Sequence, residues 1–396
     1  MSNKMVIRFS KPLSVAAVSL SLIWLPTDKA IAFSFTKIAD TSDGFSNFGL
    51  LPAINDQGTV AFFAISDEGD SGYFTGDGGG ITPIADTQGI FDQFGQFPGA
   101  AINNTGTVVF FASLDGGEQG IFTSRDGIIT TIADSSNSFQ EFGQLPGIND
   151  QDTVVFQASL DTEEQGIFSS SGGLITPIVD SSDVFSSFAS APTINNNNLV
   201  AFRGFLDTGG EGVFMSNDGL ITKIADSQGI FDFFGSSPTS NGEGTVAFFA
   251  SLDEGEEGIF TSRDGTITPI ADSRGSFDTF SGAPIIDEEG NVTFFARFDE
   301  GGEGIFRSRD GAIEKIIATG DTILGSSVTS IPFLFNKGVN DSGQVTFFAQ
   351  LDDGNRGIYL ANTDAPKPES VPEPTAVFGL LVVPLLYRRK RKRYCD

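Results

Sequence analysis

The chain has 396 residues, of which 39% are apolar, and it contains 40 Phe. This composition excludes a disordered polymer and is sufficient for a large core. The formal net charge of −28 argues against nucleic acid as a partner, because phosphates require Lys and Arg. The absence of His disfavours Ser-His nucleophile chemistry and zinc sites.

The N-terminal residues have the pattern of an export signal. Lys4, Arg8 and Lys11 precede an apolar run at residues 13–25, and small residues at Ala30 and Ala32 follow it. We therefore predict a signal peptide over residues 1–32 and export of the remainder. An N-terminal membrane anchor is the alternative, although the apolar run is short for a spanning helix.

Residues 33–362 repeat a strand ending in Ile-Ala-Asp or Ile-Val-Asp at intervals of about 46 residues. In the fifth unit, four strand-like runs cover residues 238–241, 245–252, 258–262 and 266–272. The second run is apolar on both faces, so it must be covered on both sides. The fourth run has a central Pro or Lys, which is typical of an exposed edge. Four-stranded units repeated in this way are typical of β-propeller blades.

Seven units are predicted from a Phe that recurs in the second run, at Phe62, Phe110, Phe156, Phe202, Phe248, Phe294 and Phe347. The last unit ends at its third strand, residues 357–361, whereas residues 35–40 form a fourth strand without a sheet. We therefore expect an all-β, seven-bladed β-propeller closed by the N-terminal strand in the last blade. A β-solenoid or another number of repeats is the alternative.

Pairs of Phe three residues apart precede each innermost strand, as at Phe231 and Phe234. We expect these rings to pack between blades, where edge-to-face contacts add to burial. A sugar-binding platform is the alternative, but such platforms favour Trp and Tyr, of which the chain has one and four.

Two polar positions recur in the units. The first ends the innermost strand, where it either satisfies backbone groups of a turn or rings one channel mouth and binds a polar ligand. Its members are Asn55, Asn103, Asn149, Asn195, Asn241, Asp287 and Asn340. The second opens acidic loops, which are either solvated hairpin tips or calcium sites. Its members are Asp67, Asp115, Asp161, Asp207, Asp253, Asp299 and Asp352.

Departures from the repeat are further candidates. Arg203 stands on a buried strand, so it needs a carboxylate partner or points into a channel, where it would contact a ligand. The seventh unit is longer by seven residues. Its residues 318–322 and 339–345 resemble the repeats of secreted bacterial HAF-type propeller-like proteins. That resemblance implies architecture and export rather than an activity.

The C-terminal segment has three parts in a specific order. After a linker at residues 363–371, residues 372–396 carry Pro372, Glu373 and Pro374, an apolar run at 375–387 and a basic cluster. This order resembles the PEP-CTERM sorting signal. The resemblance implies processing by an exosortase, transient inner-membrane anchoring by residues 375–387 and delivery to the cell surface. A plain C-terminal anchor is the alternative.

These patterns predict an exported, non-catalytic propeller at the cell surface or in the extracellular matrix, which binds exopolysaccharide or surface proteins. No cofactor is predicted other than calcium. One alternative is a polysaccharide lyase or glycosidase that uses carboxylates at the channel mouth, with Asp287 as the one candidate in the Asn ring. A calcium-stabilised adhesion scaffold is another.

Overall fold

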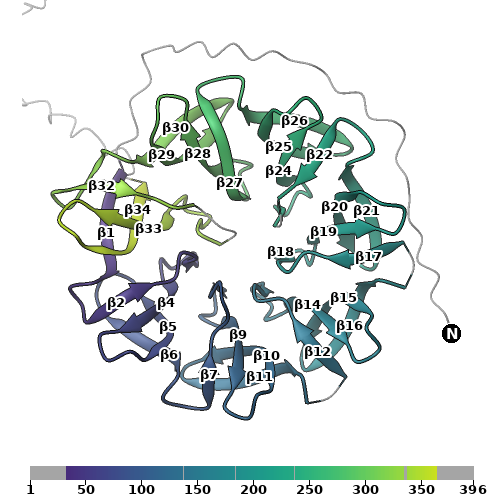
Figure 1. Cartoon of the computed structure of the whole chain (residues 1–396), viewed down its shortest axis with the longest axis horizontal. Coiled ribbons are helices and arrows are strands. Elements are labelled where there is room, and N and C mark those ends of the chain that lie inside the picture. The colour runs from purple at the N-terminus through teal and green to yellow at the C-terminus, as the bar shows by residue number, and fades with distance from the viewer. Residues whose placement is uncertain (1–32, 137, 183, 236, 334–336, 364–396) are drawn as a thin grey trace, which may run out of the picture. The chain divides into compact units, whose positions relative to one another are not determined.

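The computed structural model describes residues 33–136, 138–182, 184–235, 237–333 and 337–363. Within them, 34 β-strands form seven antiparallel sheets around a central axis (Figure 1). This all-β seven-bladed propeller confirms the predicted fold. No helix in this part of the chain is long and apolar enough to cross a membrane. The predicted leader and the sorting tail with Pro372, Glu373 and Pro374 lie outside the described residues.

Blades 1 to 3 share one plan, in which the chain starts at the inner strand and ends at the outer edge. Blade 1 contains β2 (Phe45–Phe48), β3 (Ala53–Ile54), β4 (Val60–Ser66), β5 (Ser71–Gly76) and β6 (Ile81–Asp86). Blade 2 contains β7 (Phe91–Gln93), β8 (Ala100–Ile102), β9 (Val108–Leu114), β10 (Gln119–Arg125) and β11 (Ile128–Asp134). Blade 3 contains β12 (Phe139–Phe142), β13 (Gly147–Ile148), β14 (Val154–Leu160), β15 (Gln165–Ser171) and β16 (Leu174–Asp180).

Blades 4 to 6 continue this plan, and in blade 6 the inner strand is unbroken. Blade 4 contains β17 (Phe185–Phe188), β18 (Thr193–Ile194), β19 (Val200–Leu206), β20 (Glu211–Asn217) and β21 (Leu220–Asp226). Blade 5 contains β22 (Phe231–Phe234), β23 (Thr239–Ser240), β24 (Val246–Leu252), β25 (Glu257–Arg263) and β26 (Thr266–Asp272). Blade 6 contains β27 (Phe277–Ile286), β28 (Val292–Phe298), β29 (Glu303–Arg309) and β30 (Ala312–Ala318).

Five of the six Phe pairs lie inside the inner strands rather than before them, and in blade 2 Phe91 begins β7 and Phe94 follows it. In blade 5, Phe231 pairs with Leu252 and Phe234 with Ala250, with a bulge between them. The second strand is long enough to pair with both pieces of the inner strand, β22 and β23. The expectation that the inner strand begins after the Phe pair is therefore wrong, because the bulge hides its alternation.

Blade 7 is closed by the N-terminal strand, as predicted. It contains β31 (Thr322–Ile323), β32 (Ser326–Ser330), β33 (Val345–Leu351), β34 (Arg356–Thr363) and β1 (Phe33–Asp40). Antiparallel pairs such as Phe35 with Ala361 and Asp40 with Gly357 join β1 to β34. Figure 1 shows purple β1 beside the yellow-green strands of this blade. Backbone hydrogen bonds thus join the two ends of the ring, and β1 becomes the outer edge strand of blade 7.

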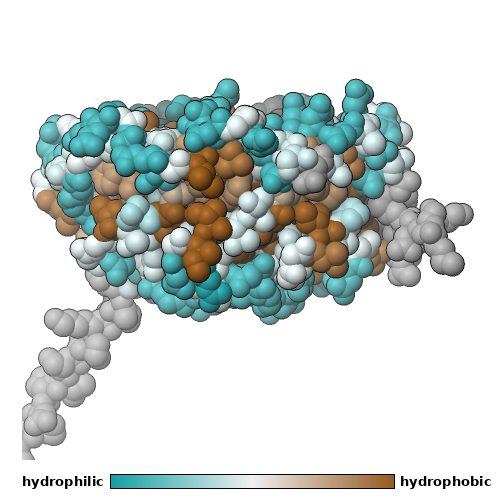
Figure 2. Space-filling view, turned by 90° about the horizontal axis from the view of Figure 1, so that it is seen from below, coloured by the Kyte–Doolittle hydropathy of each residue, from teal (hydrophilic) through white to brown (hydrophobic). Residues whose placement is uncertain are grey.

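The hydrophobic core is divided among the seams between blades. Between blades 1 and 2, Tyr73 packs with Phe94 and Phe110, at ring-centroid distances of 5.2 and 5.1 Å. Full burial of each such side chain contributes about 1.5 to 3 kcal/mol. The predicted role of Phe between blades is confirmed. Seen from its edge in Figure 2, the disc has a hydrophobic band between two hydrophilic margins.

Candidate functional site

Each inner strand ends in a tight turn that starts with the first recurring polar residue. In blade 3, the side-chain oxygen of Asn149 accepts hydrogen bonds from the backbone N–H groups of Gln151 (3.1 Å) and Thr153 (3.0 Å). An Asn side chain suits this place because it supplies an acceptor that the tight backbone lacks. The side-chain oxygen therefore stabilises the turn.

The amide nitrogens of these residues connect neighbouring blades. Asn149 donates to the carbonyl of Asn195 at 3.1 Å, and Asn340 donates to the carbonyl of Asn55 at 2.9 Å. We call Asn55, Asn103, Asn149, Asn195, Asn241, Asp287 and Asn340 the inner ring; its six Asn all make this bond. The oxygen and the nitrogen of each Asn carboxamide are therefore both hydrogen-bonded to backbone groups. The turn role is confirmed, whereas ligand binding by these residues stays a prediction.

Asp287 interrupts the inner ring because a carboxylate cannot donate. Its two oxygens accept hydrogen bonds from the backbone and side chain of Asn291, both at 2.8 Å. Arg307 of β29 spans the seam between blades 6 and 7 instead. Its side chain is fully buried, and it donates to Thr293 at 3.3 Å and to the carbonyl of Gly343 in the blade 7 turn. A buried cation thus bridges the gap in the ring.

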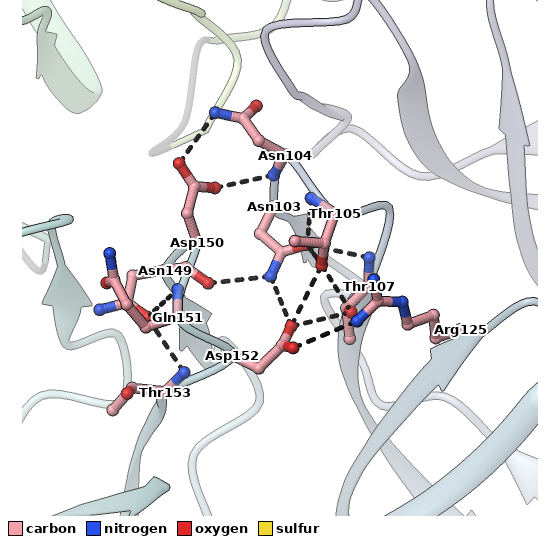
Figure 3. Close-up of polar contacts among 10 residues, drawn as sticks. All are labelled: Asn103, Asn104, Thr105, Thr107, Arg125, Asn149, Asp150, Gln151, Asp152 and Thr153. Carbon is pink, nitrogen blue, oxygen red and sulfur yellow. Dashed lines mark hydrogen bonds and ion pairs between the residues drawn. The ribbon is translucent and has the colours of Figure 1, made fainter.

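The residue after each inner-ring member varies from blade to blade. We call Asp56, Asn104, Asp150, Asn196, Gly242, Glu288 and Asp341 the mouth ring; all except Gly242 line the channel opening. Backbone N–H groups of one blade bond side chains of the next: Asn104 donates to Asp150, and Asp341 to Asp56, both at 2.8 Å. Figure 3 shows the contact between Asn104 and Asp150. Four carboxylates and two amides are thereby held around the opening.

A cavity of about 140 Å³ lies beneath the mouth ring, where all seven blades meet. Its wall combines polar residues, such as Thr193, Thr239 and Ser240, with the aliphatic side chains of Ile54, Ile102, Ile148, Ile194, Ile285, Ile286 and Val339. The ammonium group of Lys337 donates to the carbonyl of Ile194 at 3.4 Å. Lys337 precedes β33, and blade 4 lies across the ring from blade 7 (Figure 1). The side chain of Lys337 therefore spans the channel.

The electrostatics of the mouth affect two of its titratable groups. Burial raises the pKa of Asp341 to about 6, and the carboxylates of Asp56 and Glu288 add to this increase. Burial lowers the pKa of Lys337, although Asp150 and Asp341 act against this effect. The site therefore offers acceptors for hydroxyl or ammonium groups and one carboxyl that titrates close to neutral pH.

The seam between blades 2 and 3, beside the mouth ring, is filled with polar groups (Figure 3). Asp152 accepts hydrogen bonds from Asn103 (2.8 Å), Thr107 (2.9 Å) and Thr105 (3.2 Å), and Arg125 lies 3.3 Å away. Burial alone would raise the pKa of Asp152, but these hydrogen bonds and Arg125 lower it below its ordinary value. This carboxylate therefore connects two blades.

Arg203 is buried and has the carboxylate partner that the sequence requires. Its guanidinium pairs with Glu211 on β20 and lies 4.8 Å from the ring centroid of Phe205 and 4.5 Å from that of Phe233. Glu211 also accepts a hydrogen bond from the backbone of Phe234 in blade 5 at 2.9 Å. Arg203 is not among the residues that line the channel, and a ligand contact stays a prediction.

The second recurring position lies at the other end of the second strands, away from the mouth ring. Its members are Asp67, Asp115, Asp161, Asp207, Asp253, Asp299 and Asp352, one in each blade. In the described ranges, no group of three or more His, Cys, Asp or Glu is placed to hold a metal ion. Calcium binding stays a prediction, and a melting temperature unaffected by chelator would contradict it.

Repetition alone does not reveal the mouth ring or Lys337. The mouth ring changes among Asp, Asn, Gly and Glu beside the most regular position of the chain, and that contrast is the signal that could have found it. Lys337 belongs to the longer seventh unit. Only the folded ring shows that its side chain crosses the channel.

Comparisons with known proteins place the chain in a family and support its fold. The family of unknown function DUF7453 matches residues 23–136, 176–333 and 269–356, more than half of the chain. No curated protein matches in sequence. Oligogalacturonate lyase from Vibrio parahaemolyticus is similar at 11% identity and a TM-score of 0.53, covering 85% of this chain and 98% of its own. An oligogalacturonate lyase in complex with manganese is similar at 12% identity and a TM-score of 0.52, and it covers the same shares of the two chains.

A puromycin-hydrolysing peptidase of Mycobacterium tuberculosis is also similar, at 11% identity and a TM-score of 0.55, over 85% of this chain and 55% of its own. At such identities the likeness shows the fold alone. The extent of the family match decides the relationship: the chain belongs to the DUF7453 family.

Proposed function

We propose that this protein is an exported, non-catalytic binding propeller that holds a surface polysaccharide at the mouth of its channel. The observation that carries the proposal is the mouth ring, in which the repeat varies around the one opening shared by all blades. Its carboxylates, from Asp56, Asp150, Glu288 and Asp341, converge there with two amides. Convergent polar groups at a concave site are typical of ligand binding.

The chemistry of the mouth favours a neutral or amine-bearing polymer. Carboxylate and amide oxygens accept hydrogen bonds from hydroxyl and ammonium groups. The net charge of −28 and the four acids of the mouth would repel uronic acids. A polysaccharide that carries amines thus has the strongest attraction, and this attraction should weaken with salt.

The side chains of the mouth ring are also held in fixed positions before a ligand binds. Asp56 and Asp150 each accept a backbone hydrogen bond from a neighbouring blade at 2.8 Å. Groups that are held in place before binding lose little conformational entropy when the ligand arrives. This geometry supports a rigid binding site.

The proposed binding can be measured with three polymers: chitosan, dextran and polygalacturonate. The full chain should bind chitosan most strongly and polygalacturonate least. The double variant Asp56→Asn with Asp150→Asn keeps one acceptor oxygen at each position, replaces the other with an NH2 group and removes two charges. Chitosan affinity should therefore fall at least about tenfold, or 1.4 kcal/mol. The matched control, Asp115→Asn with Asp161→Asn, removes two charges at the other end of the blades and should bind normally. Absence of binding to all three polymers would contradict the proposal.

The delivery route is the second part of the proposal. The leader at residues 1–32 and the resemblance of residues 372–396 to a PEP-CTERM signal support export, exosortase processing and release at the surface. In cells, replacing Pro372, Glu373 and Pro374 with Ala should retain the protein in the membrane fraction. Unchanged release from the membrane would contradict this route.

A glycosidase or lyase is the second candidate, and one observation favours it. Asp341 has a pKa of about 6, with Asp56 and Glu288 nearby, and a raised carboxyl pKa beside an ionised partner is typical of glycoside hydrolysis. New reducing ends released from chitosan, and lost in Asp341→Asn, would replace the binding proposal with a catalytic one. We expect no release.

A further inference from the structure

A groove of about 540 Å³ lies in the seam between blades 4 and 5, outside the channel. It is lined by the inner turns of both blades, by β20 and β21, and by the outer hairpin of blade 5. Its rim includes Asn197, the neighbour of Asn196 at the channel mouth. The groove and the mouth therefore adjoin.

The repeat explains why this seam is open. Between blades 2 and 3, Asp152 fills the space against Thr105, Thr107 and Arg125 (Figure 3). Two repeats later, the corresponding positions hold Gly244, Asn197, Leu199 and Asn217. Gly244 has no side chain, and the only heavy atom close to a Cβ at this position belongs to Leu199, at 3.9 Å. At this seam Gly244 leaves open the space that the Asp152 side chain fills between blades 2 and 3.

The floor of the groove is apolar and its rim is polar. Leu199 and Met215 replace the two Thr found at these positions in blade 2, and Ile224 lies beside them. The rim carries Asn197, Asn217, Thr222, Glu243 and Asp264. A ligand that fits must therefore have an apolar face and hydrogen-bonding edges.

The charged groups of the groove are unequal in number. Lys223 pairs with Asp226 at 2.5 Å on one wall, whereas on the other wall Arg263 forms ion pairs with Glu243 and, at 3.9 Å, with Asp264. The side chain of Asp264 is 94% exposed. Three carboxylates thus stand with two cations around the groove, and this excess of negative charge disfavours an anionic ligand.

From these features we propose that the groove binds one or two pyranose rings of a neutral or amine-bearing saccharide. A pyranose has C–H faces that pack on an aliphatic floor and hydroxyl edges that pair with amides and carboxylates. The volume lies in the range of small-molecule sites, about 300 to 1,000 Å³. The groove extends the surface next to the mouth ring, but its saccharide site does not depend on binding at the mouth.

Met215 provides a direct reporter, because the other two methionines, Met1 and Met5, precede the described residues. The full chain is labelled at the methionine methyl groups, and Met215→Leu assigns the signal. Cellobiose and the disaccharide of chitosan should shift the Met215 resonance with saturation, whereas digalacturonate should not. No shift with either of the first two disaccharides at tens of millimolar would overturn the proposal.

A variant that refills the groove gives the second test. Gly244→Asp introduces the residue of the blade 3 turn, where Asp152 has a positive φ of 57°. Gly244 has a φ of 79°, so the change strains the backbone, and the control must carry the same strain. Affinity should fall at least tenfold. Gly106→Asp, in a turn with φ of 81° and no atom near a Cβ, is the matched control and should bind normally.

If Gly244→Asp bound the two disaccharides as tightly as the wild type does, at an unchanged melting temperature, the proposed saccharide site in the groove would be overturned. The mouth variant Asp56→Asn with Asp150→Asn should retain the Met215 shift. Failure of the channel-mouth proposal is therefore distinguishable from failure of this one.

Discussion

The inner ring and the mouth ring are one residue apart in sequence and differ in almost every property. Inner-ring side chains are buried, and the six Asn among them bond to backbone groups in their own and the neighbouring blade. Mouth-ring side chains line the opening and change from blade to blade. The comparison teaches that the repeated position builds the ring, whereas the varied position beside it is available for recognition.

The gap at Asp287 gives the strongest test of the structural half of this comparison. Arg307→Ala removes the bridge to Gly343 and leaves a cavity in a fully buried place. The free energy of unfolding should fall by about 3 kcal/mol. Denaturant titration measures it.

The control for this variant is Arg307→Met, which copies Met215 at the same position of blade 4. It refills the space but makes none of the hydrogen bonds to Thr293 and Gly343, so it should recover only the part of the loss that comes from the cavity. If Arg307→Ala and the wild type had equal free energies of unfolding, the bond from Arg307 to Gly343 would not be needed to stabilise the ring at Asp287.

Removing one Asn side chain of the inner ring should cause the next largest loss of unfolding free energy. Asn149→Ala leaves the carbonyl of Asn195 and the N–H groups of Gln151 and Thr153 without their partner. The expected loss of unfolding free energy is about 2 kcal/mol. Gln151→Ala changes the exposed side chain of the same turn and should cost almost nothing. Equal stabilities of the two variants would contradict the structural role of the ring.

Much of the ring was accessible from the sequence, because each unit repeats the same strands and turns. The closure by β1 followed from the missing fourth strand of the last unit. The inner strand was harder, since the bulge between Phe231 and Phe234 breaks its alternation. The site could not be predicted as a whole: Lys337 and the mouth ring meet only after blades distant in sequence have closed the circle.

The filled seam between blades 2 and 3 should show a smaller, pH-dependent effect. The pKa of Asp152 is lowered from 3.8, so its stabilisation is present above that pH and disappears as the pH falls through the folded-state value. Asp152→Gly, which copies Gly106 and Gly244, should lose about 1 kcal/mol or less at pH 7, because solvent screens the half-exposed carboxylate. Its unfolding free energy should decline less than that of the wild type between pH 5 and pH 3. An equal decline would contradict this role.

The charge of Asp341 should affect the free energy of unfolding in the direction opposite to that of Asp152, and by the smallest amount. Its pKa is raised from 3.8 to about 6, so the associated stability is present below pH 3.8 and is lost as the pH rises through 6. Asp341→Asn should be more stable than the wild type at pH 7 by less than about 1 kcal/mol, given its exposure to solvent. The two proteins should be equally stable near pH 3. Destabilisation at pH 7 would show that the charged mouth stabilises the ring.

Calorimetric titration of chitosan oligosaccharides into the wild type, Asp56→Asn with Asp150→Asn, and Asn149→Ala tests the division between the two rings most directly. We expect the mouth variant to lose at least about tenfold in affinity at an unchanged melting temperature. Asn149→Ala, which changes no charge, should unfold at a lower temperature while binding normally below it. A mouth variant that binds like the wild type would contradict the account.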